Sequence, residues 1–388
     1  MSPLLNKEDW DYPGSGDFDF ALLEKLGVEI RNLVTDSREV KPGDTFLAYP
    51  GEKSDGRRYI PQAIAAGVSS ILWDSAGFAW NSAWHIPNLP VAGLRAKAGI
   101  IADQVYRHPS SKLWLIGITG TNGKTSCSHW IAQAMTALGT RAAIIGTLGI
   151  GFPGELVPTA NTTPNAVLLQ KELAELFERG ARVAAMEVSS HGIVQERING
   201  STFGVALLTN LSRDHLDYHG SMEAYAEAKA RLFRWPGLKH AVLNMDDPFG
   251  VQVSRNLAGA SVEIIGYGFT DFLNHIPVAG YAKNMRVMRG YGVKSDPEGL
   301  MFNIEFESEK IEFKAGVIGG FNASNLLGVL ATLITSGINL REAVEALRAI
   351  RPVAGRMEQM GGGDSPLIVI DYAHTPDALE KVLMTVRE

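Results

Sequence analysis

The stretch from Trp114 to Ser126 constrains the fold more than any other part of the 388-residue sequence. An apolar run, Leu113–Ile118, predicts a buried strand, and a helical pattern begins at Cys127 after a turn rich in Gly, Thr and Asn. Such a turn binds nucleotide triphosphates, because its glycines let backbone N–H groups close on phosphate oxygens and the helix N-terminus adds its positive dipole end. The sequence therefore predicts a phosphate-binding turn.

Two residues at the end of this turn have specific expected roles. Lys124 would meet the β- and γ-phosphates, and Thr125 would ligate Mg²⁺. Gly117 lies six residues before Gly123, whereas the standard pattern G-x-x-x-x-G-K-[ST] places its two glycines about five apart. An ordinary glycine-rich turn therefore stays open as the alternative to a nucleotide site, which the strand-to-helix context favours.

Composition excludes several classes of protein. A net charge of −6 argues against non-specific nucleic-acid binding, which needs basic patches, and the single cysteine, Cys127, excludes an internal disulfide framework. Met1–Trp10 shows no secretion signal, and no apolar run approaches the roughly 20 residues of a membrane span. We expect a cytoplasmic monomer with neither nucleic-acid nor membrane partners.

The chain divides into three regions, and the expected fold class is α/β. Residues 1–111 predict a small α/β unit that ends in a linker at 109–111. Residues 112–357 alternate apolar strands with helices, which indicates a mostly parallel sheet covered on both faces. Within this region we expect a small antiparallel insertion at 262–314 and a return to helix at 321–349. Residues 358–388 begin a third unit with another buried strand, at 366–370, a loop and a helix.

Glu187 is the first candidate metal ligand outside the turn. It lies in the apolar run Val183–Val188, where a carboxylate is costly to bury unless it is paired or bound to metal. Groups at the carboxyl ends of parallel strands face the nucleotide crevice, so we interpret Glu187 as a Mg²⁺ ligand beside Thr125. A structural glutamate that caps the following loop is the alternative.

A polar cluster follows the next apolar strand, Val205–Leu208, and contains Asp214, His215, Asp217 and His219. Imidazole and carboxylate groups both ligate divalent metals. The cluster also falls at the expected edge of the crevice. The pattern alone leaves His215 balanced between a metal ligand and a structural histidine.

Two further features stay ambiguous from the residues alone. Lys229 shares a helical stripe with Tyr225 and Phe233, which suits a lysine whose stem covers apolar surface as well as an active-site lysine. The loop at 160–164 is either an anion-binding turn or a helix N-cap, with Thr163 before the proline.

From about Thr35 onward, the sequence resembles the Mur ligases, the ATP-dependent ligases of peptidoglycan synthesis. The nearest branch adds an amino acid to UDP-N-acetylmuramoyl-L-alanyl-D-glutamate. The resemblance rests on the following segments: Thr35-Asp-Ser-Arg, Pro42-Gly-Asp, Asp55-Gly-Arg-Arg-Tyr-Ile-Pro-Gln-Ala, Thr119-Gly-Thr-Asn-Gly-Lys-Thr, Asn161-Thr-Thr, Met186-Glu-Val-Ser-Ser-His-Gly, Asn210-Leu-Ser-Arg-Asp-His-Leu-Asp-Tyr-His, Gly320-Phe-Asn-Ala-Ser-Asn, Gly355-Arg-Met-Glu and Asp371-Tyr-Ala-His-Thr-Pro-Asp-Ala-Leu-Glu-Lys.

The resemblance implies a role for each matching residue. The uridine contacts would be Thr35 and Ser37, flanked by Glu52, Lys53 and Ser54. The ATP contacts would be Gly120, Thr121, Asn122, Gly123, Lys124, Thr125 and Ser126, with Asn322, Arg356, Asp371 and His374 from the hinge side. The muramoyl-dipeptide contacts would be Asn161, Thr162, Thr163, Ser189, Gln195 and Arg197. Lys229 would be a carbamylated lysine that organises Mg²⁺ with Thr125, Glu187 and His215.

The resemblance also implies the chemistry. A substrate carboxylate attacks the γ-phosphate of ATP to give an acyl phosphate, and an amine then displaces phosphate to form the amide. The family reads the amino acid through an Asp-Asn-Pro-Arg motif of a third, Rossmann-like ligase domain. That motif does not occur in the sequence, and residues 358–388 match only the start of the domain. The overall resemblance favours meso-diaminopimelate over lysine.

Two alternatives to a Mur ligase remain. A folylpolyglutamate synthetase shares the phosphate turn and the chemistry, but it would begin close to that turn, without the 111-residue region that precedes it here. The other alternative is a non-catalytic nucleotide-binding fragment. Retention of Lys124, Glu187, His215 and Lys229 together argues for catalysis.

Overall fold

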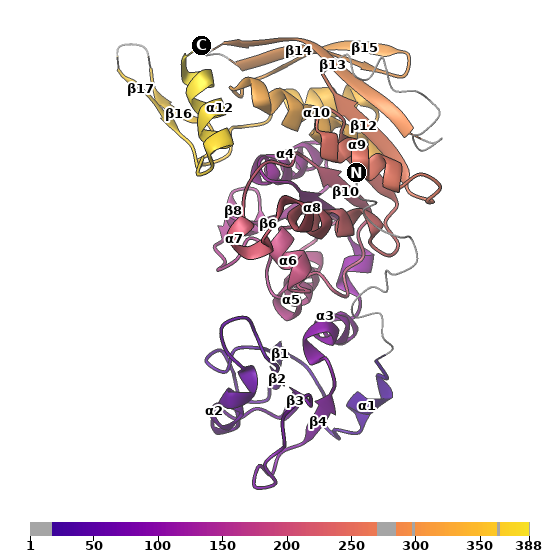
Figure 1. Ribbon diagram of the computed structural model, residues 1–388, viewed down its shortest axis with the longest axis vertical. Helices are drawn as coiled ribbons and strands as arrows, with labels where there is room; N and C mark the ends of the chain where they lie inside the picture. The colour runs from indigo at the N-terminus through magenta and orange to yellow at the C-terminus, as the bar shows by residue number, and fades with distance from the viewer. Residues whose placement is uncertain (1–17, 270–284, 297–298, 363–364, 388) are drawn as a thin grey trace. The chain divides into compact units, whose positions relative to one another are not determined.

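The computed structural model describes residues 18–269, 285–296, 299–362 and 365–387 (Figure 1). The chain folds as two units, each with a sheet of its own. The first unit comprises Met1–Ser110, Pro164–Glu175 and Gln195–Ser201, and the second comprises Ser111–Thr163, Leu176–Val194 and Thr202–Glu388. The N-terminal segment considered for a secretion signal lies outside the described residues.

A four-stranded parallel sheet forms the first unit, in the order β1-β2-β3-β4. Successive side chains of β2 point to opposite faces, so Leu47 packs with Leu94 of α3 whereas Phe46 packs with Ile60 of α2. The elements of this unit are α1 (Ala21–Glu24), β1 (Leu33–Val34), β2 (Thr45–Ala48), η1 (Gly56–Tyr59), α2 (Ile60–Ala65), β3 (Ser70–Asp74), β4 (Asn88–Val91) and α3 (Leu94–Val105).

The second unit is built on an eleven-stranded sheet, in the order β15-β14-β13-β12-β11-β10-β5-β9-β6-β7-β8. Every neighbouring pair from β13 to β6 is parallel, and the strands added at the two edges are antiparallel. The strands are β5 (Trp114–Thr119), β6 (Ala142–Gly146), β7 (Gly149–Phe152), β8 (Glu155–Val157), β9 (Val183–Glu187), β10 (Val205–Leu208), β11 (His240–Asn244), β12 (Glu263–Gly268), β13 (Met285–Asp296), β14 (Gly299–Phe306) and β15 (Glu309–Ala315).

The central strands are buried along their whole length, because β6, β9 and β10 contain only buried residues. Since alternate residues face opposite sides, both faces of this sheet are covered, and the predicted α/β class is confirmed. The helices that follow β5 in the chain are α4 (Lys124–Ala137), α5 (Ala166–Glu178), α6 (Ser190–Val194), α7 (Leu216–His219), α8 (Met222–Ala230), η3 (Arg231–Arg234), α9 (Pro248–Asn256), α10 (Gly320–Thr335) and α11 (Leu340–Arg348).

Three local predictions have different outcomes in the structure. The expected linker at 109–111 coincides with the boundary between the two units, at Ser110 and Ser111, and its residues form a short helix, η2 (Pro109–Lys112), in which Pro109 and Ser110 are buried. The stretch 262–314, apart from 270–284 and 297–298, which lie outside the described residues, does contain the expected antiparallel strands, since β14 pairs with β13 and β15. It is not a separate insertion, because β12 pairs with both β11 and β13 and these strands continue the central sheet. The expected return to helix at 321–349 is confirmed, as two helices, α10 and α11, separated by a turn at Gly337 (φ 88°).

The strand predicted as buried near the C-terminus is instead exposed. β17 (Leu367–Ile370) pairs with β16 (Glu358–Gly361) in a two-stranded sheet, before α12 (Pro376–Arg387). Ile368 is 55% exposed because no other described strand pairs with this ribbon. The second unit includes this segment, so the structure does not separate a third domain at residue 357. The predicted division into domains at 1–111, 112–357 and 358–388 stays a prediction. Among the described residues, no helix combines the length and apolarity needed to cross a membrane.

Candidate nucleotide site

The phosphate turn lies between β5 and α4, as the sequence predicts, and both of its glycines are required there. Gly120 has φ 146° and Gly123 has φ 87°. A Cβ atom would lie 1.9 Å from Thr209 Oγ1 at the first position and 2.4 Å from Asn325 Oδ1 at the second. The close approach and the backbone conformation therefore both exclude side chains.

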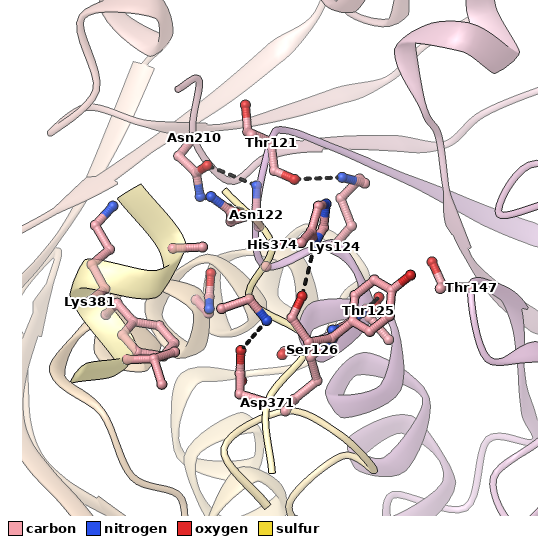
Figure 2. Close-up of a pocket in the computed structure, with 18 of the residues that line it drawn as sticks. Thr121, Asn122, Lys124, Thr125, Ser126, Thr147, Asn210, Asp371, His374 and Lys381 are labelled. Carbon is pink, nitrogen blue, oxygen red and sulfur yellow. Dashed lines mark hydrogen bonds between the residues drawn. The ribbon is translucent and has the colours of Figure 1, made fainter. Parts of the chain in front are cut away.

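Asn210, which follows β10, ties that strand to the turn. Its Oδ1 accepts a hydrogen bond from Asn122 N at 3.0 Å, and its Nδ2 donates to Asn122 O at 3.0 Å. The backbone continues the tie, since Thr121 N donates to Asn210 O at 2.9 Å. These bonds fix the backbone of the turn (Figure 2).

The Lys124 ammonium is held against the turn that precedes it. Nζ donates to Gly120 O at 2.9 Å and to Thr121 O at 2.8 Å. Burial lowers the pKa of Lys124, and the Glu187 carboxylate partly opposes that shift. The side chain is thus placed at the turn by its hydrogen bonds and by a nearby negative charge.

A pocket of about 320 Å³ opens at this turn, within the range of about 300–1,000 Å³ that is typical of ligand pockets. Figure 2 shows Thr121, Lys124, Asp371 and Lys381 around it. Every predicted ATP contact lines the pocket except Gly120, the first glycine of the turn. The structure therefore brings together residues that are 250 positions apart in the chain, from Thr121 to Asp371.

Glu187 is buried at the end of β9, with 1% of its surface exposed. Its carboxylate accepts hydrogen bonds from Thr125 Oγ1 at 3.1 Å, Thr147 N at 2.8 Å and Thr147 Oγ1 at 3.1 Å. Gly146 makes room for the carboxylate, because a Cβ there would lie 2.2 Å from Glu187 Oε1. No lysine or arginine forms an ion pair with Glu187 among the described residues.

A buried carboxylate and a hydroxyl form an oxygen donor set that suits Mg²⁺. The Arg356 guanidinium also contacts this donor set, since its Nη2 donates to Thr125 Oγ1 at 3.2 Å. No group of three or more His, Cys, Asp or Glu side chains able to hold a metal occurs in the described part of the chain. Thr125 and Glu187 thus fit a magnesium ion that also takes oxygen ligands from the nucleotide.

His215 lines the same pocket, immediately before α7, with its backbone in the left-handed region (φ 51°). Its Nε2 lies 3.3 Å from Asp214 Oδ2, and burial lowers the pKa of its imidazole. Thr125, Glu187 and His215 therefore meet at one pocket, although they follow three different strands.

Lys229 does not line the pocket but lies behind the phosphate turn. Nζ donates to Gly120 O at 2.8 Å and lies 4.4 Å from the centroid of the Tyr225 ring. With 1% of its surface exposed, Lys229 is not a lysine that extends to solvent, so that alternative is wrong. Burial, reinforced by the neighbouring Lys124 charge, holds the pKa of Lys229 well below its ordinary value.

The predicted muramoyl-dipeptide contacts are divided between the two units. Thr162 and Ser189 line the pocket of the second unit, whereas Gln195 and Arg197 belong to the first. Thr163 Oγ1 donates to Glu187 O at 2.9 Å and shares a hydrogen bond with Ser189 Oγ. Asn161 belongs to the second unit but does not line the pocket.

The N-cap alternative for the 160–164 loop assigned the cap of α5 to Thr163, but another residue makes this bond. Asn165 Oδ1 accepts a hydrogen bond from Leu168 N at 3.0 Å. Among the described contacts, the Thr163 hydroxyl turns instead toward the end of β9.

The predicted uridine contacts all lie in the first unit. Ser37 Oγ donates to Gln62 Oε1 at 3.0 Å, and Glu52 accepts from Arg95 at 2.7 Å. Thr35, Lys53 and Ser54 belong to the same unit. The structure therefore keeps these residues together in one unit.

Several residues that line the pocket were not predicted as site residues. Thr147 directly follows β6, so the rule that strand ends face the crevice could have found it. Asn210 and Asn325 lie inside segments that carried the family resemblance. Lys381 lies on α12, at the end of another of these segments.

Comparison with known proteins places this site in a family. Residues 118–333 match the model of the Mur ligase middle domain, and residues 29–106 match the Mur ligase family catalytic domain. The chain belongs to the Mur ligase family, as the sequence motifs predicted.

Its relatives include particular ligases. UDP-N-acetylmuramoyl-L-alanyl-D-glutamate--2,6-diaminopimelate ligase of Nitrosomonas europaea is 54% identical, over 95% of this chain and 70% of the relative. The Chromobacterium violaceum protein of the same name is 49% identical, over 96% and 73%. A solved structure of such a ligase, 32% identical, superposes with a TM-score of 0.75, over 92% of this chain and 70% of that one.

Two glycines that flank α4 offer a test of the phosphate turn. Gly139→Ala is expected to destabilise the protein by about 1–2 kcal/mol, the cost of a left-handed non-glycine residue, because Gly139 has φ 83° but open space around it. Gly123→Ala has a similar backbone cost and also displaces Asn325, so it should weaken ADP binding as well. Urea unfolding and ADP titration of both variants measure these effects. Equal ADP affinity in the two variants would contradict the proposed turn.

Proposed function

We propose that the protein is an ATP-dependent ligase that joins meso-diaminopimelate to UDP-N-acetylmuramoyl-L-alanyl-D-glutamate in peptidoglycan synthesis. The observation that carries the proposal is the buried Glu187 carboxylate, which forms no ion pair with a lysine or arginine among the described residues, beside Lys124 and Thr125 of a phosphate turn. The names of the relatives at 54% and 49% identity support the choice of substrate and amino acid. The oligomeric state and location stay predictions, a monomer in the cytoplasm.

The reaction brings two anions together. A substrate carboxylate oxygen bonds to the γ-phosphorus of ATP while the bond to ADP breaks, and an acyl phosphate forms. The amine nitrogen of the amino acid then attacks the acyl carbon, and phosphate leaves as the amide forms and the nitrogen loses a proton. The Lys124 ammonium and the N–H groups of the turn stabilise the negative charge. Thr121–Ser126, Asn322, Arg356, Asp371 and His374 bind the nucleotide.

Thr125 and Glu187 would hold Mg²⁺, and His215 would hold a second ion with modified Lys229. A bound magnesium ion neutralises phosphate charge during transfer. The oxygen donors of Thr125 and Glu187 support the first site, because the carboxylate has no cationic partner among the described residues.

Lys229 becomes a carbamate in this proposal. Its lowered pKa favours the neutral amine, which is the form that attacks CO₂. The nitrogen of the neutral amine bonds to the carbon of CO₂ and loses a proton, which converts a buried neutral group into an anion near Lys124. Lys124 and Lys229 both donate to Gly120 O, so the carbamate would place a negative charge close to the Lys124 ammonium, which is a favourable interaction.

The remaining predicted contacts recognise the nucleotide-sugar substrate. Thr35, Ser37 and the segment 52–54 contact the uridine end, and the muramoyl-dipeptide set contacts the peptide end. The match of residues 29–106 to the Mur ligase family supports this over a folylpolyglutamate synthetase. Retention of Lys124, Glu187, His215 and Lys229 argues against a non-catalytic fragment.

The first half-reaction tests the proposal without the amino acid. ATP, Mg²⁺ and UDP-N-acetylmuramoyl-L-alanyl-D-glutamate should give ADP and an acyl phosphate, trapped by hydroxylamine as a hydroxamate. Reactions supplemented with meso-diaminopimelate or lysine then compare the two amines. ADP formation that needs a folate substrate in place of the nucleotide sugar would overturn the assignment.

Carbamylation of Lys229 has a separate test. Lys229→Ala should lose ADP formation, and a short carboxylate such as acetate should restore part of it by occupying the place of the carbamate. The unchanged protein in ¹³C-labelled bicarbonate should show a carbamate resonance that disappears in Lys229→Ala and persists in Lys239→Ala, whose lysine lies over Trp114. A resonance that survives Lys229→Ala would contradict the assignment.

A further inference from the structure

The segment that carries His215 does not hold its own conformation. His215 stands in the left-handed region before α7, which has four residues and ends at Gly220 (φ 77°). A single helical turn is not stable alone, because nucleation fixes several residues for one hydrogen bond. Contacts from elsewhere in the second unit must therefore set the position of His215.

Those contacts come from α8, whose Tyr225 ring lies 5.1 Å from the His219 ring, and from α6. His219 Nε2 and Ser190 Oγ lie 2.9 Å apart, within hydrogen-bond distance. The His191 ring packs against Tyr218 with centroids 4.1 Å apart, and it meets the His215 ring edge-on at 4.7 Å. We call these four residues, Ser190, His191, Tyr218 and His219, the clasp.

The sheet explains why such a clasp is needed. Glu187 ends β9 and precedes α6, whereas His215 follows β10. In the strand order β10-β5-β9, one strand separates them, so no ladder of backbone hydrogen bonds joins β9 to β10 directly. The clasp joins the two segments that leave those strands, and it thereby sets His215 relative to Glu187.

His191 is the central residue of the clasp. Among the described residues it is the nearest aromatic neighbour of His215, whose side chain is 42% exposed. His191 does not line the nucleotide pocket, so any effect on an ion bound there would pass through His215. Gly192, the next residue, lies close to Thr163, where an added Cβ would come within 2.6 Å of Thr163 Cγ2, so α6 has little freedom to shift.

We propose that His191 is a positioning residue, whose ring, packed against Tyr218, holds the His215 imidazole in place to bind a divalent ion. The inference rests on the proposed function, since it takes His215 as a metal ligand. Loss of residues that orient a metal ligand commonly costs about 10–100-fold in metal affinity or activity. His191→Ala should therefore weaken metal binding by about tenfold or more, whereas His191→Phe, which keeps a ring, should retain most of it.

Mn²⁺ provides the probe, because its binding to the ADP-loaded protein can be followed by electron paramagnetic resonance without turnover. His215→Ala sets the scale of the loss, and His85→Ala, which removes an exposed histidine of the first unit, is the control. ADP formation by His191→Ala should need a higher Mg²⁺ concentration to reach half of its maximal rate. The fold-change in that concentration should exceed the fold-change in the rate at saturating Mg²⁺. Thermal unfolding shows whether each variant is folded.

The outcomes separate the inference from the function. Weaker Mn²⁺ binding in His191→Ala and His215→Ala, with His191→Phe close to the unchanged protein, supports the clasp. Weaker binding in His215→Ala alone overturns it, and so does equal weakening in His191→Ala and His191→Phe. Unchanged Mn²⁺ binding in His215→Ala overturns the premise that His215 is a metal ligand. Dipeptide-dependent ADP formation by the unchanged protein would still support the proposed ligase function.

Discussion

Replacing Lys124 with methionine is expected to lower dipeptide-dependent ADP formation by at least about 100-fold, a typical loss when one group that stabilises transition-state charge is removed. Methionine keeps most of the length of the side chain, so the change isolates the ammonium. That ammonium donates to Gly120 O and Thr121 O. The carboxylates of Glu187 and Asp214 are close enough to act on it electrostatically. Nucleotide affinity should fall together with the rate.

Lys112→Met provides the matched control. Lys112 lies in η2 before β5, where its Nζ is 5.6 Å from the Phe177 ring centroid, so the variant removes a lysine of the same unit outside the pocket. ADP binding by calorimetry and ADP formation should be near those of the unchanged protein. If Lys124→Met bound and hydrolysed ATP as well as Lys112→Met, the phosphate-turn assignment would be wrong.

The phosphate turn could be predicted because its signal is local. Strand, glycines, Lys-Thr and helix are consecutive in the sequence, although the atoms that exclude side chains at 120 and 123 belong to distant residues, Thr209 after β10 and Asn325 of α10. Glu187 could be found for a similar reason, since one carboxylate interrupts an apolar strand. The rule of strand ends then placed it at the crevice.

Other features depend on pairing and burial that periodicity does not encode. The pattern at 367–370 predicts a strand, but whether anything covers it is decided by the rest of the fold, and in the described residues β17 is exposed. A helical stripe places Lys229 beside Tyr225 but does not say whether that face is buried. Likewise, the alternating strands from 285 onward could not reveal that they extend the central sheet through β12.

The second large effect is expected for Glu187→Gln, which should leave the fold nearly unchanged while abolishing catalysis. Gln is isosteric with Glu, and its Oε1 can still accept the hydrogen bond from Thr147 N. Its Nε2 can donate to the hydroxyls of Thr125 and Thr147, because a hydroxyl both donates and accepts. All three hydrogen bonds of the cradle can therefore be kept.

What Glu187→Gln removes is the negative charge, and only the proposed chemistry needs that charge. A structural role for Glu187 would be met by these hydrogen bonds, so a merely structural glutamate predicts little loss of activity. A metal ligand predicts a loss of about 100-fold or more in ADP formation, with weaker Mn²⁺ binding to the ADP-loaded protein. Glu263→Gln, on the exposed first residue of β12, is the control for loss of a carboxylate. If Glu187→Gln were active and bound Mn²⁺ with unchanged affinity, the negative charge of Glu187 would be needed neither for catalysis nor for metal binding. Glu187 would then have the structural role that the sequence left open.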